Sequence, residues 1–444
     1  MSLAFDLDKG SDSLHSTGGI CLIGQVLSFS QIDRSFRDSF LKGFRFQDHD
    51  ILKSLIGLLA QGREKFTDIS QFRDDQVFMK SLGLKAVPSE ESLRQRLEIM
   101  PETHGDLLRE SNVKLLKGID FGTIEKAGIT FIPVDADVSP LDNSNSQREN
   151  LSWTYKKHDG FAPMFAYIGS EGYMLDHELR PGKQHSQKGM PEFLEELFQS
   201  LSQLKLKKPT LLRLDSAHDA SANFEVFQKN QAHNGYFIIK RNQRKEVNEQ
   251  YLALARRTGR KAISREGKNV YYGEIHHRNP QNDESLPAVP MIYKVTERLT
   301  DQDGQDLLIP KLDVETYWTD LPLEAESVIE LYHDHGTSEQ FHSELKSDMN
   351  VERLPSAKFA VNKLYLACSM LAFNVLRIIG QTLVEHKKLA PVKIKGKRRR
   401  LRTVIRDLIF IACKHVRHSG KETLKFGRNS PWFEVFKKIS TSLQ

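Results

Sequence analysis

The chain has 444 residues, of which 39% are hydrophobic and 27% charged, with a formal net charge of +6 at pH 7 and a pI near 8.9. This composition excludes a disordered or fibrous protein and indicates a soluble globular chain with two to four structural units. The three cysteines, Cys21, Cys368 and Cys413, are far apart in the sequence. Their spacing excludes a disulfide framework and a structural zinc site, and it favours a reducing cytosol.

The most apolar long stretch, from Leu364 to Leu376, contains Ser369 and Asn374 and runs into Arg377. We interpret it as too short and too polar to cross a bilayer. The N-terminal residues lack the charged and apolar segments of a signal peptide. The sequence therefore predicts a cytoplasmic protein with no membrane partner.

Residues 1–125 follow a helical pattern after a start rich in Gly and Ser. Ser89 is placed to cap a helix with two glutamates in its first turn. The leucines of that helix form one stripe, which leaves Arg94 and Arg96 on other faces, as on a helix that enters a DNA groove. An ordinary amphipathic surface helix is the alternative.

From residue 126 the apolar pattern changes to short strands separated by helices. A hairpin turn at residues 170–172 joins the second strand to the third. The predicted elements are strands 129–137, 161–169 and 173–179, a helix ending at Leu204, strand 210–214, helix 220–229 and strand 236–240. This order predicts an α/β fold with a ribonuclease-H-like mixed sheet and helices on both faces.

The final acidic helix of such a core is delayed by a segment rich in turn residues, 241–322. Strand-like pieces at 270–275, 289–295 and 314–318 indicate a β-rich insertion. Helix resumes near Leu323 and breaks at Gly336, after which Thr337 can cap a second helix with Gln340 three residues later.

These patterns predict five regions. They are a helical N-terminal region at 1–125 for DNA binding or dimerisation, the first part of the core at 126–240, the insertion at 241–322, the second part of the core at 323–386, and a basic helical region at 387–444.

Three acidic residues end or begin these elements. Asp137 and Asp215 each follow an apolar strand, and Glu339 lies in the first turn of a helix. Carboxylates at a sheet rim can hold hard cations such as Mg²⁺, and two ions can clamp the attacking and leaving oxygens of a phosphoryl displacement. A site for metal-dependent cleavage of phosphodiesters is therefore predicted if the three acids converge. At helical spacing Glu339 shares a face with Lys346, whereas Glu344 points elsewhere.

Ten of the twenty residues from Lys387 to Arg406 are Lys or Arg. A solvated linker is the usual interpretation of such a run. Here the run passes into an apolar helical pattern at 404–413, so we expect part of it to be folded and able to follow a phosphate backbone. The basic residues that we single out for DNA contact are Lys397, Arg398, Arg399, Arg400 and Arg402.

The spacing of Tyr332, His335, Glu339 and Lys346 resembles the Tyr-Arg-Glu-Lys signature of DDE transposases whose core carries a β-rich insertion. Within that group the chain resembles insertion-sequence family 1380 over nearly its whole length. The motifs that carry this likeness are Val134-Asp-Ala-Asp-Val-Ser-Pro, Asp142-Asn-Ser, Leu212-Arg-Leu-Asp-Ser, Ile239-Lys-Arg-Asn and Gly336-Thr-Ser-Glu-Gln.

The resemblance implies that Asp137, Asp215 and Glu339 are the catalytic metal ligands. Asp137 fits the strand end of the family best, and Asp135, on the same face of the strand, stays an alternative. Asp219 is the rival of Asp215, and its position after the strand favours a capping role.

The same resemblance assigns residues around the metal site to DNA. Tyr332 and Lys346 would hold a phosphate beside the cleavage point. His335 stands where the family has Arg, and an imidazole cannot make the permanent bidentate contact of a guanidinium. Trp318, in the insertion, would stack on an extruded base or serve as a core residue.

The activity implied is cut-and-paste DNA transposition with two Mg²⁺ ions for each active site, for which Mn²⁺ can substitute. The implied partners are double-stranded DNA, both terminal inverted repeats and target, and a second copy of the chain in a paired-end homodimer, in a bacterial cytoplasm next to the nucleoid. The sequence offers no nucleotide-binding loop, so no nucleotide cofactor is expected. The alternatives are a transposase-derived DNA-binding protein that no longer cuts, and a metal-dependent nuclease without strand transfer.

Overall fold

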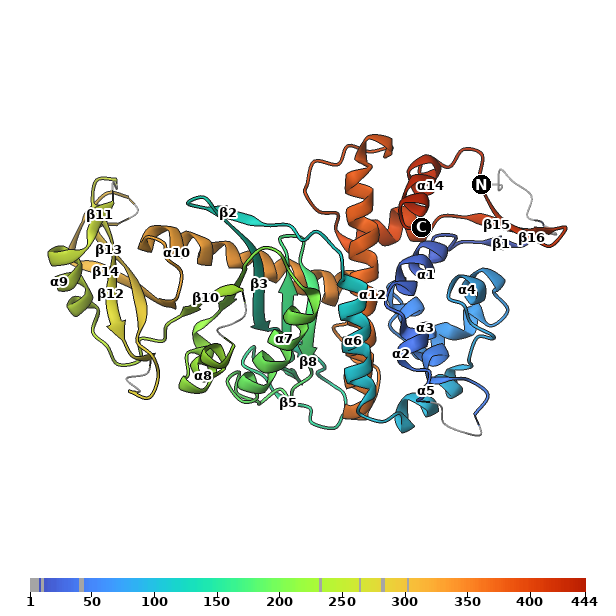
Figure 1. The fold of residues 1–444 in the computed structure, drawn as a ribbon, viewed down its shortest axis with the longest axis horizontal. Coiled ribbons are helices and arrows are strands. Elements are labelled where there is room, and N and C mark those ends of the chain that lie inside the picture. The colour runs from blue at the N-terminus through green and yellow to red at the C-terminus, as the bar shows by residue number, and fades with distance from the viewer. Residues whose placement is uncertain are drawn as a thin grey trace, which may run out of the picture. The chain divides into compact units, whose positions relative to one another are not determined.

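The computed structural model describes residues 8, 12–39, 44–230, 234–262, 265–280, 284–301 and 303–444. The chain forms two compact units (Figure 1). The first, which we call the helical unit, comprises Met1–Leu116 and Glu344–Gln444. The second, the sheet unit, comprises Lys117–Ser343.

The helical unit contains the predicted helical N-terminal region. The predicted cap at Ser89 is confirmed, because its hydroxyl accepts a hydrogen bond of 3.2 Å from the N–H of Ser92. Before α12, its elements are β1 (Leu14–His15), α1 (Ile20–Ser28), α2 (Ile32–Ser35), α3 (Asp48–Leu59), a 3-10 helix (Phe66–Phe72), α4 (Gln76–Ser81), α5 (Glu90–Ile99), α6 (His104–Leu116) and a π-helix (Glu344–Asp348).

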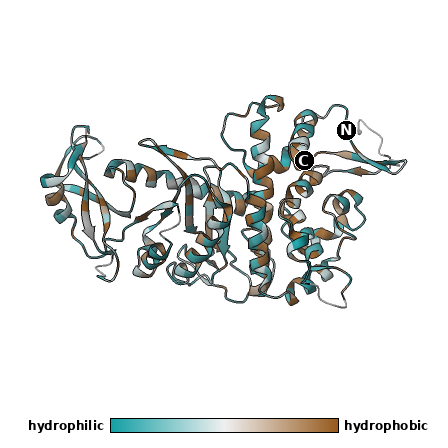
Figure 2. Cartoon of the chain, viewed as in Figure 1, coloured by the Kyte–Doolittle hydropathy of each residue, from teal (hydrophilic) through white to brown (hydrophobic). Residues whose placement is uncertain are grey.

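Helix α12 (Phe359–Glu385) is the core of the helical unit. It has 27 residues, so it is longer than the apolar stretch that the sequence suggested, and its length and composition would suffice to cross a membrane. In the described part of the chain it is the one helix with that property, and 83% of its most apolar window is buried. Figure 2 shows that many residues along it are hydrophobic, and the helix packs against α1, α3 and α6. We therefore describe α12 as a core helix.

The C-terminal region departs from its helical prediction. The helix predicted over 404–413 ends at Ile409, and Cys413 begins a strand that pairs with β1 near the N-terminus. Pairing between residues so far apart in sequence is invisible to local periodicity. The elements after α12 are a 3-10 helix (Lys387–Leu389), α13 (Leu401–Val404), a π-helix (Ile405–Ile409), β15 (Cys413–His418), β16 (Lys421–Phe426) and α14 (Phe433–Ser442).

The sheet unit is built on one large mixed sheet. Its elements up to residue 240 are β2 (Ile124–Lys126), β3 (Ile129–Val138), β4 (Leu141–Asp142), β5 (Ser152–Trp153), β6 (Asp159–Phe161), β7 (Met164–Ile168), β8 (Tyr173–Glu178), α7 (Met190–Leu204), β9 (Thr210–Leu214), a 3-10 helix (Ser216–His218), α8 (Ser221–Lys229) and β10 (Gly235–Lys240). The strand, helix, strand, helix, strand order that the sequence predicted is confirmed.

The sheet has the topology of a ribonuclease-H-like core. Strands β3, β7 and β8 form an antiparallel meander, and β9 and β10 run parallel to β3, in the spatial order β8, β7, β3, β9, β10. Helices α7 and α8 supply the connections that parallel strands require. The predicted fold class is therefore confirmed.

The predicted insertion is β-rich and extends the same sheet. β14 pairs antiparallel with β10, so the strands of the insertion continue the sheet of the core. One helix in this segment, α9, was not predicted. The remaining elements of the unit are α9 (Asn248–Thr258), β11 (Arg260–Ala262), β12 (Lys268–Arg278), β13 (Val289–Thr300), β14 (Asp306–Thr319), α10 (Ala325–His333), a 3-10 helix (Asp334–Thr337) and α11 (Ser338–Ser343).

The two faces of the sheet carry different helices. Because side chains alternate along a strand, Leu211 and Ile238 point to one face, where they pack with Val328 and Leu331 of α10. Leu212 and Phe237 point to the other face, toward α7 and α8.

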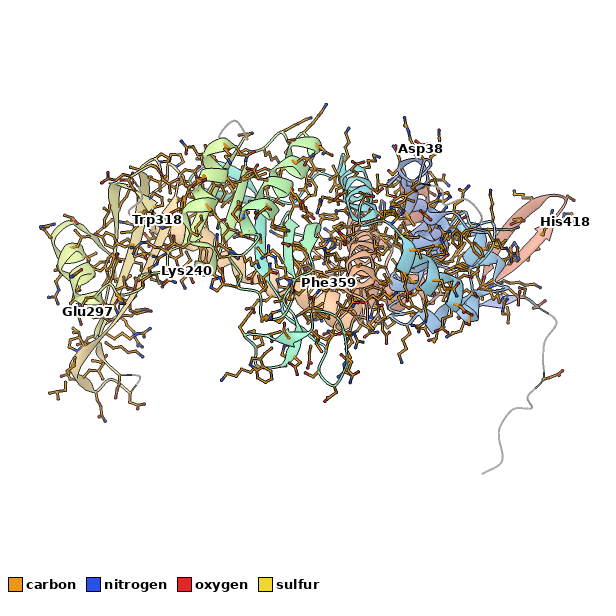
Figure 3. The ribbon with its side chains drawn as sticks, turned by 90° about the horizontal axis from the view of Figure 1, so that it is seen from below. Asp38, Lys240, Glu297, Trp318, Phe359 and His418 are labelled. Atoms are coloured by element: carbon orange, nitrogen blue, oxygen red, sulfur yellow. The ribbon has the colours of Figure 1, made fainter. Side chains whose placement is uncertain are left out.

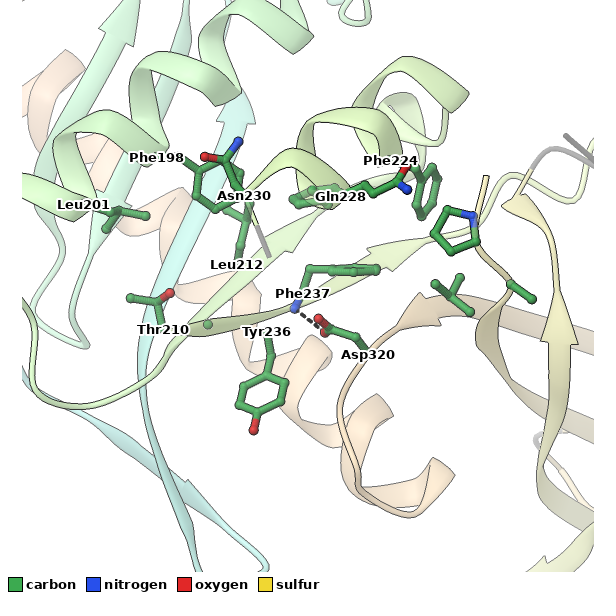
Figure 4. A pocket seen from close by; sticks show the side chains of 15 residues that line it. Phe198, Leu201, Thr210, Leu212, Phe224, Gln228, Asn230, Tyr236, Phe237 and Asp320 are labelled. Carbon is green, nitrogen blue, oxygen red and sulfur yellow. Dashed lines mark hydrogen bonds between the residues drawn. The ribbon is translucent and has the colours of Figure 1, made fainter. Parts of the chain in front are cut away.

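On the α7 and α8 face the structure has an apolar cavity of about 250 Å³ (Figure 4). Phe198 and Phe224 contribute to its walls, and the carboxylate of Asp320 accepts a hydrogen bond of 2.8 Å from the N–H of Phe237 at its edge. The cavity thus lies on the side of the sheet opposite α10.

Candidate active site

Two of the three predicted acids lie together on the α10 face. β3 and β9 are adjacent and parallel, with Ala136 paired to Leu214, so Asp137 and Asp215 follow at the same edge of the sheet. Asp137 is partly buried, and the side chain of Asp215 is 42% exposed. One oxygen of Asp137 accepts from the N–H of Val138 at 2.7 Å, and one of Asp215 accepts from Ala217 at 3.0 Å. The remaining oxygen of Asp215 leaves it able to act as a hard-cation ligand.

Two tyrosines lie within electrostatic reach of this pair of carboxylates. Burial raises the pKa of Tyr332 on α10, and the negative charges of Asp215 and Asp137 raise it further. Tyr155 is 59% exposed as a whole, but its hydroxyl is partly buried against β3, and this desolvation together with the same two charges raises its pKa to about 12. Both phenols therefore stay protonated at neutral pH and keep an O–H beside the acids. The charges of both aspartates act on Tyr332 of α10 and on Tyr155 of the 139–163 connection. The two carboxylates therefore share one electrostatic environment.

Asp135, the alternative to Asp137, has a different partner. Its two carboxylate oxygens accept from Arg213 Nε and Nη2 at 2.6 and 2.7 Å, and the two residues are paired in register on β3 and β9. Both side chains are at most 5% exposed. Arg213 also donates from Nη1 to the carbonyl of Leu331 at 2.7 Å, which fastens α10 to the sheet. Asp135 therefore stabilises the sheet beneath the site in this structure.

Glu339 is carried by α11, which packs on the same face of the sheet. Phe165 is the β7 residue paired with Asp137, and its ring centroid lies 5.5 Å from that of His342. The neighbouring Tyr167 is in hydrogen-bond contact with His342 Nδ1 at 3.3 Å. Glu339 precedes His342 by nearly one helical turn and is exposed. The helix of the third acid is thus fixed over the strand next to Asp137.

The donor set suits a hard divalent cation only in part. Carboxylate oxygens are the ligands that Mg²⁺ takes from proteins, usually one or two carboxylates with waters and substrate phosphates completing the shell. Asp137 and Asp215 meet this requirement. Among the described residues no three His, Cys, Asp or Glu side chains stand close enough to share one ion, so the structure does not bring Glu339 to the aspartates.

Glu344, the rejected alternative to Glu339, is fully engaged elsewhere. It is 1% exposed and lies in the helical unit. Its carboxylate accepts from Arg377 Nη2 and from the N–H of Leu401, both at 3.0 Å, and pairs with Arg398 at 2.9 Å. These contacts agree with its exclusion from the metal site.

Two further members of the predicted signature remain untested. The turn after α11 is a π-helix over Glu344–Asp348, so the 3.6-residue spacing that placed Lys346 on the stripe of Glu339 does not continue through it. Lys346 is half-buried. The side chain of His335 lies outside the described residues.

Trp318 is a core residue in this structure. It is 1% exposed, and its indole N–H donates to Asp219 Oδ1 at 3.0 Å (Figure 3 labels Trp318). Asp219 also accepts from the N–H of Asn242 at 2.9 Å, so its carboxylate joins Trp318 of β14 to the loop that follows β10. The ring of Trp318 would have to be uncovered before it could stack on a base.

The two predicted DNA contacts in α5 differ. Arg94 is 47% exposed and pairs with Glu90 one turn away. Arg96 is 3% exposed and forms an ion pair with the buried Asp48, which also contacts His104. The prediction that both arginines lie on outer faces is therefore wrong for Arg96, because a buried acid on α3 draws it inward.

The basic segment is folded by its own arginines. Arg399 donates to Asp407 at 2.7 Å, and Arg400 to Asp348 at 2.8 Å. Arg402 lies 3.4 Å from the same Asp348, and Arg398 pairs with Glu344. The lysines differ: no ion pair is found within the described chain for five exposed lysines, Lys387, Lys388, Lys393, Lys395 and Lys397.

Two residues near the acids are not predicted from the sequence, Tyr155 and His218. Tyr155 lies in the connection between β3 and β7, which has no clear periodicity, so the sequence pattern does not single it out. His218 is fully buried, with Nε2 3.4 Å from Asp215 Oδ1. The sequence signal for His218 is its position three residues after Asp215, the aspartate at the end of β9.

This fold and site define a class of enzyme with acidic residues on a ribonuclease-H-like sheet. The family described as Transposase DDE domain group 1 matches residues 6–444, and the chain belongs to this family. Membership makes it a DNA transposase, and enzymes of this family generally use divalent metal ions. Neither insertion-sequence family 1380 nor the Tyr-Arg-Glu-Lys signature is established by this match.

Among solved structures, a piggyBac transposase synaptic complex with hairpin DNA is similar to the chain. The identity is 10% and the TM-score 0.41, over 89% of this chain and 80% of that one. Because the likeness is low, it carries no argument about the site. No curated protein matches the chain.

Proposed function

We propose that the chain cuts and rejoins DNA by cut-and-paste transposition, with Asp137, Asp215 and Glu339 as the catalytic acids. The observation that supports this most is the pair of aspartates at the ends of adjacent parallel strands, whose charges both act on the same two tyrosines. The fixed position of α11 on the same face of the sheet supports Glu339 as the third acid. Terminal inverted repeats, target DNA and a second copy of the chain would be the partners.

Asp137 and Asp215 would hold the divalent ions, with Glu339 joining when DNA is bound. Bound Mg²⁺ supplies charge neutralisation on the phosphate and a more acidic attacking water or 3′-hydroxyl. The phenols of Tyr332 and Tyr155 stay protonated, so they can donate hydrogen bonds to phosphate oxygens without adding negative charge. The main contribution of the protein is then positioning of the scissile bond.

The experiment uses a plasmid that carries the DNA flanking both sides of the coding sequence, a target plasmid and Mg²⁺. The expected wild-type result is a joined product. Glu339→Gln should bind the flanking DNA as wild type does and form no joined product. Glu195→Gln is the matched control, because Glu195 lies on α7 with its side chain 46% exposed. Normal joining by Glu339→Gln would contradict the assignment.

The same assay separates the two other candidate functions. Cleavage without joining would identify a nuclease, and binding without cleavage would identify a DNA-binding protein derived from a transposase. Among the described residues Glu339 does not share an ion site with the two aspartates, so the possibility of a DNA-binding protein that does not cut is tested directly. Cleavage by wild type in Mg²⁺, absent in EDTA, excludes it.

A further inference from the structure

The connection between β3 and β7 carries exposed aromatic side chains beside the candidate site. Trp153 is 60% exposed and Tyr155 59% exposed. Trp318 is 1% exposed, which shows how differently an aromatic residue of this unit is placed when it serves the core. Large aromatic rings contribute most when desolvated, so two exposed rings so close in sequence mark a surface suited to a partner.

Hydrogen bonds hold the segment that carries these rings in a defined conformation. β5 and β6 pair through Ser152 with Gly160 and Trp153 with Asp159. Both the N–H and the hydroxyl of Thr154 donate to the carbonyl of His158 at 2.9 Å. An aromatic surface that is already ordered by hydrogen bonds loses less conformational entropy when it binds.

The segment is also fastened next to the acids. The hydroxyl of Tyr155 donates to the carbonyl of Val138 at 3.0 Å, and Val138 directly follows Asp137. The charges of Asp137 and Asp215 reach the same phenol. The position of Tyr155 relative to the candidate catalytic carboxylates is therefore fixed by the backbone of β3.

Positive charge accompanies the rings. Lys156 and Lys157 follow Tyr155, and both are exposed. The ammonium of Lys156 lies 5.6 Å from the centroid of the Tyr155 ring. Cations that neutralise phosphates, interleaved with aromatic faces, are the combination by which proteins bind unpaired nucleotides. A duplex hides its base faces, so for a duplex the lysines alone would matter.

We propose that Trp153, Tyr155, Lys156 and Lys157 form a stacking platform for unpaired nucleotides next to the DNA bond cut at Asp137 and Asp215. The place of these nucleotides rests on the proposed function, whereas their binding does not. The two rings stack on bases, and the two lysines contact the flanking phosphates.

Tryptophan fluorescence tests stacking directly. The chain has three tryptophans, of which Trp153 is exposed, Trp318 buried and Trp432 half-buried. A twelve-nucleotide oligothymidylate added in EDTA should quench the emission of the wild-type protein. Trp153→Phe should lose this quenching while it keeps most of its affinity, because phenylalanine still stacks. Trp432→Phe is the matched control and should retain the quenching.

Affinity gives the second measurement. Trp153→Ala and Tyr155→Ala should each weaken binding of the labelled oligothymidylate by about 5- to 100-fold, the range for loss of one stacked base. Binding of a blunt 30-base-pair duplex should change less than twofold. Equal losses for both DNA forms, or quenching that persists in Trp153→Phe, would overturn the platform. A change in oligomeric state without any DNA-dependent quenching would assign the surface to protein contact and would also overturn it.

The outcomes separate this inference from the proposed function. Oligothymidylate binding in EDTA requires no catalysis, so a double variant Asp137→Asn and Asp215→Asn should still be quenched, and it should bind at least as tightly as wild type because two negative charges near the platform are removed. If wild type fails to cleave but shows the quenching, only the transposition proposal falls. If wild type joins DNA and Trp153→Ala does so with unchanged oligothymidylate affinity, only the platform falls.

Discussion

Asp135 and Asp137 lie two residues apart on one face of β3, and substitutions should separate their roles. Asp135→Ala removes the bidentate partner of Arg213, both of whose bonds to Asp135 are 2.7 Å or shorter, and leaves a guanidinium that is 2% exposed. Removing one member of a buried ion pair costs about 3 to 5 kcal/mol. For a unit of this size each kcal/mol shifts the melting temperature by about 2 to 4 °C, so a drop near 10 °C is expected.

The assay is thermal unfolding of the full chain, with cleavage of flanking DNA measured at a temperature where both variants are folded. Asp137→Asn should change the free energy of unfolding by less than about 1 kcal/mol, because the side chain is partly exposed and the asparagine keeps an oxygen that can accept from the N–H of Val138. It should abolish cleavage. The reasoning is refuted if Asp135→Ala melts as wild type does and loses cleavage, because Asp135 would then be the metal ligand.

Three further predictions concern the supports of the site. Although burial opposes it, hydrogen bonds from Tyr317, Lys294 and His333 lower the pKa of Glu315 to about 2 from 4.5. The lowered pKa means that ionised Glu315 stabilises the folded state by about 3 kcal/mol above pH 4.5, and this contribution is lost as the pH falls toward 2. The difference in free energy of unfolding between wild type and Glu315→Gln should therefore shrink to about half by pH 3. Gly172 has φ +72°, and an added Cβ would lie 2.3 Å from the Phe341 ring of α11. Gly172→Ala should therefore displace α11, lower the free energy of unfolding by about 1 to 3 kcal/mol and slow cleavage. An unchanged cleavage rate would contradict the role of α11. Alanine at the five exposed lysines of the basic segment should reduce the salt slope of duplex binding by up to about 4.5, whereas alanine at Lys205, Lys207 and Lys208 should leave it unchanged. If the five-lysine variant kept the wild-type slope, the segment would not belong to the DNA interface.

The strand order and the two aspartates were predictable because their signals are local. A buried strand is an apolar run of five to ten residues, and a carboxylate at its end is visible without any partner. The β4 to β6 sheet was missed because strands of two or three residues carry no periodicity. The continuation of the sheet through β14 was missed because it depends on pairing between β10 and a strand far along the chain.

The burial of individual polar side chains could not be predicted from the sequence. Alternation along β3 places Asp135 and Asp137 on one face, but only the register with β9 reveals that Arg213 neutralises the first. The leucine stripe of its helix predicts Arg96 on another, outer face, and a single buried acid, Asp48, reverses that. A charge within an apolar strand, such as Arg213 between Leu212 and Leu214, is the sequence signal for a buried pair.

The insertion contributes to the site through α10 and cannot be regarded as an appended module. Glu315 on β14 accepts from Lys294 and contacts His333 of α10, both within 2.9 Å. From the core side, Arg213 holds the carbonyl of Leu331 two residues earlier. Tyr332, which faces the aspartates, lies between these two attachments. α10 is followed by a 3-10 helix and then α11, so a shift of the insertion strands would move both Tyr332 and Glu339. The insertion that separates Asp215 from Glu339 in the sequence therefore also supports the helix that carries Glu339.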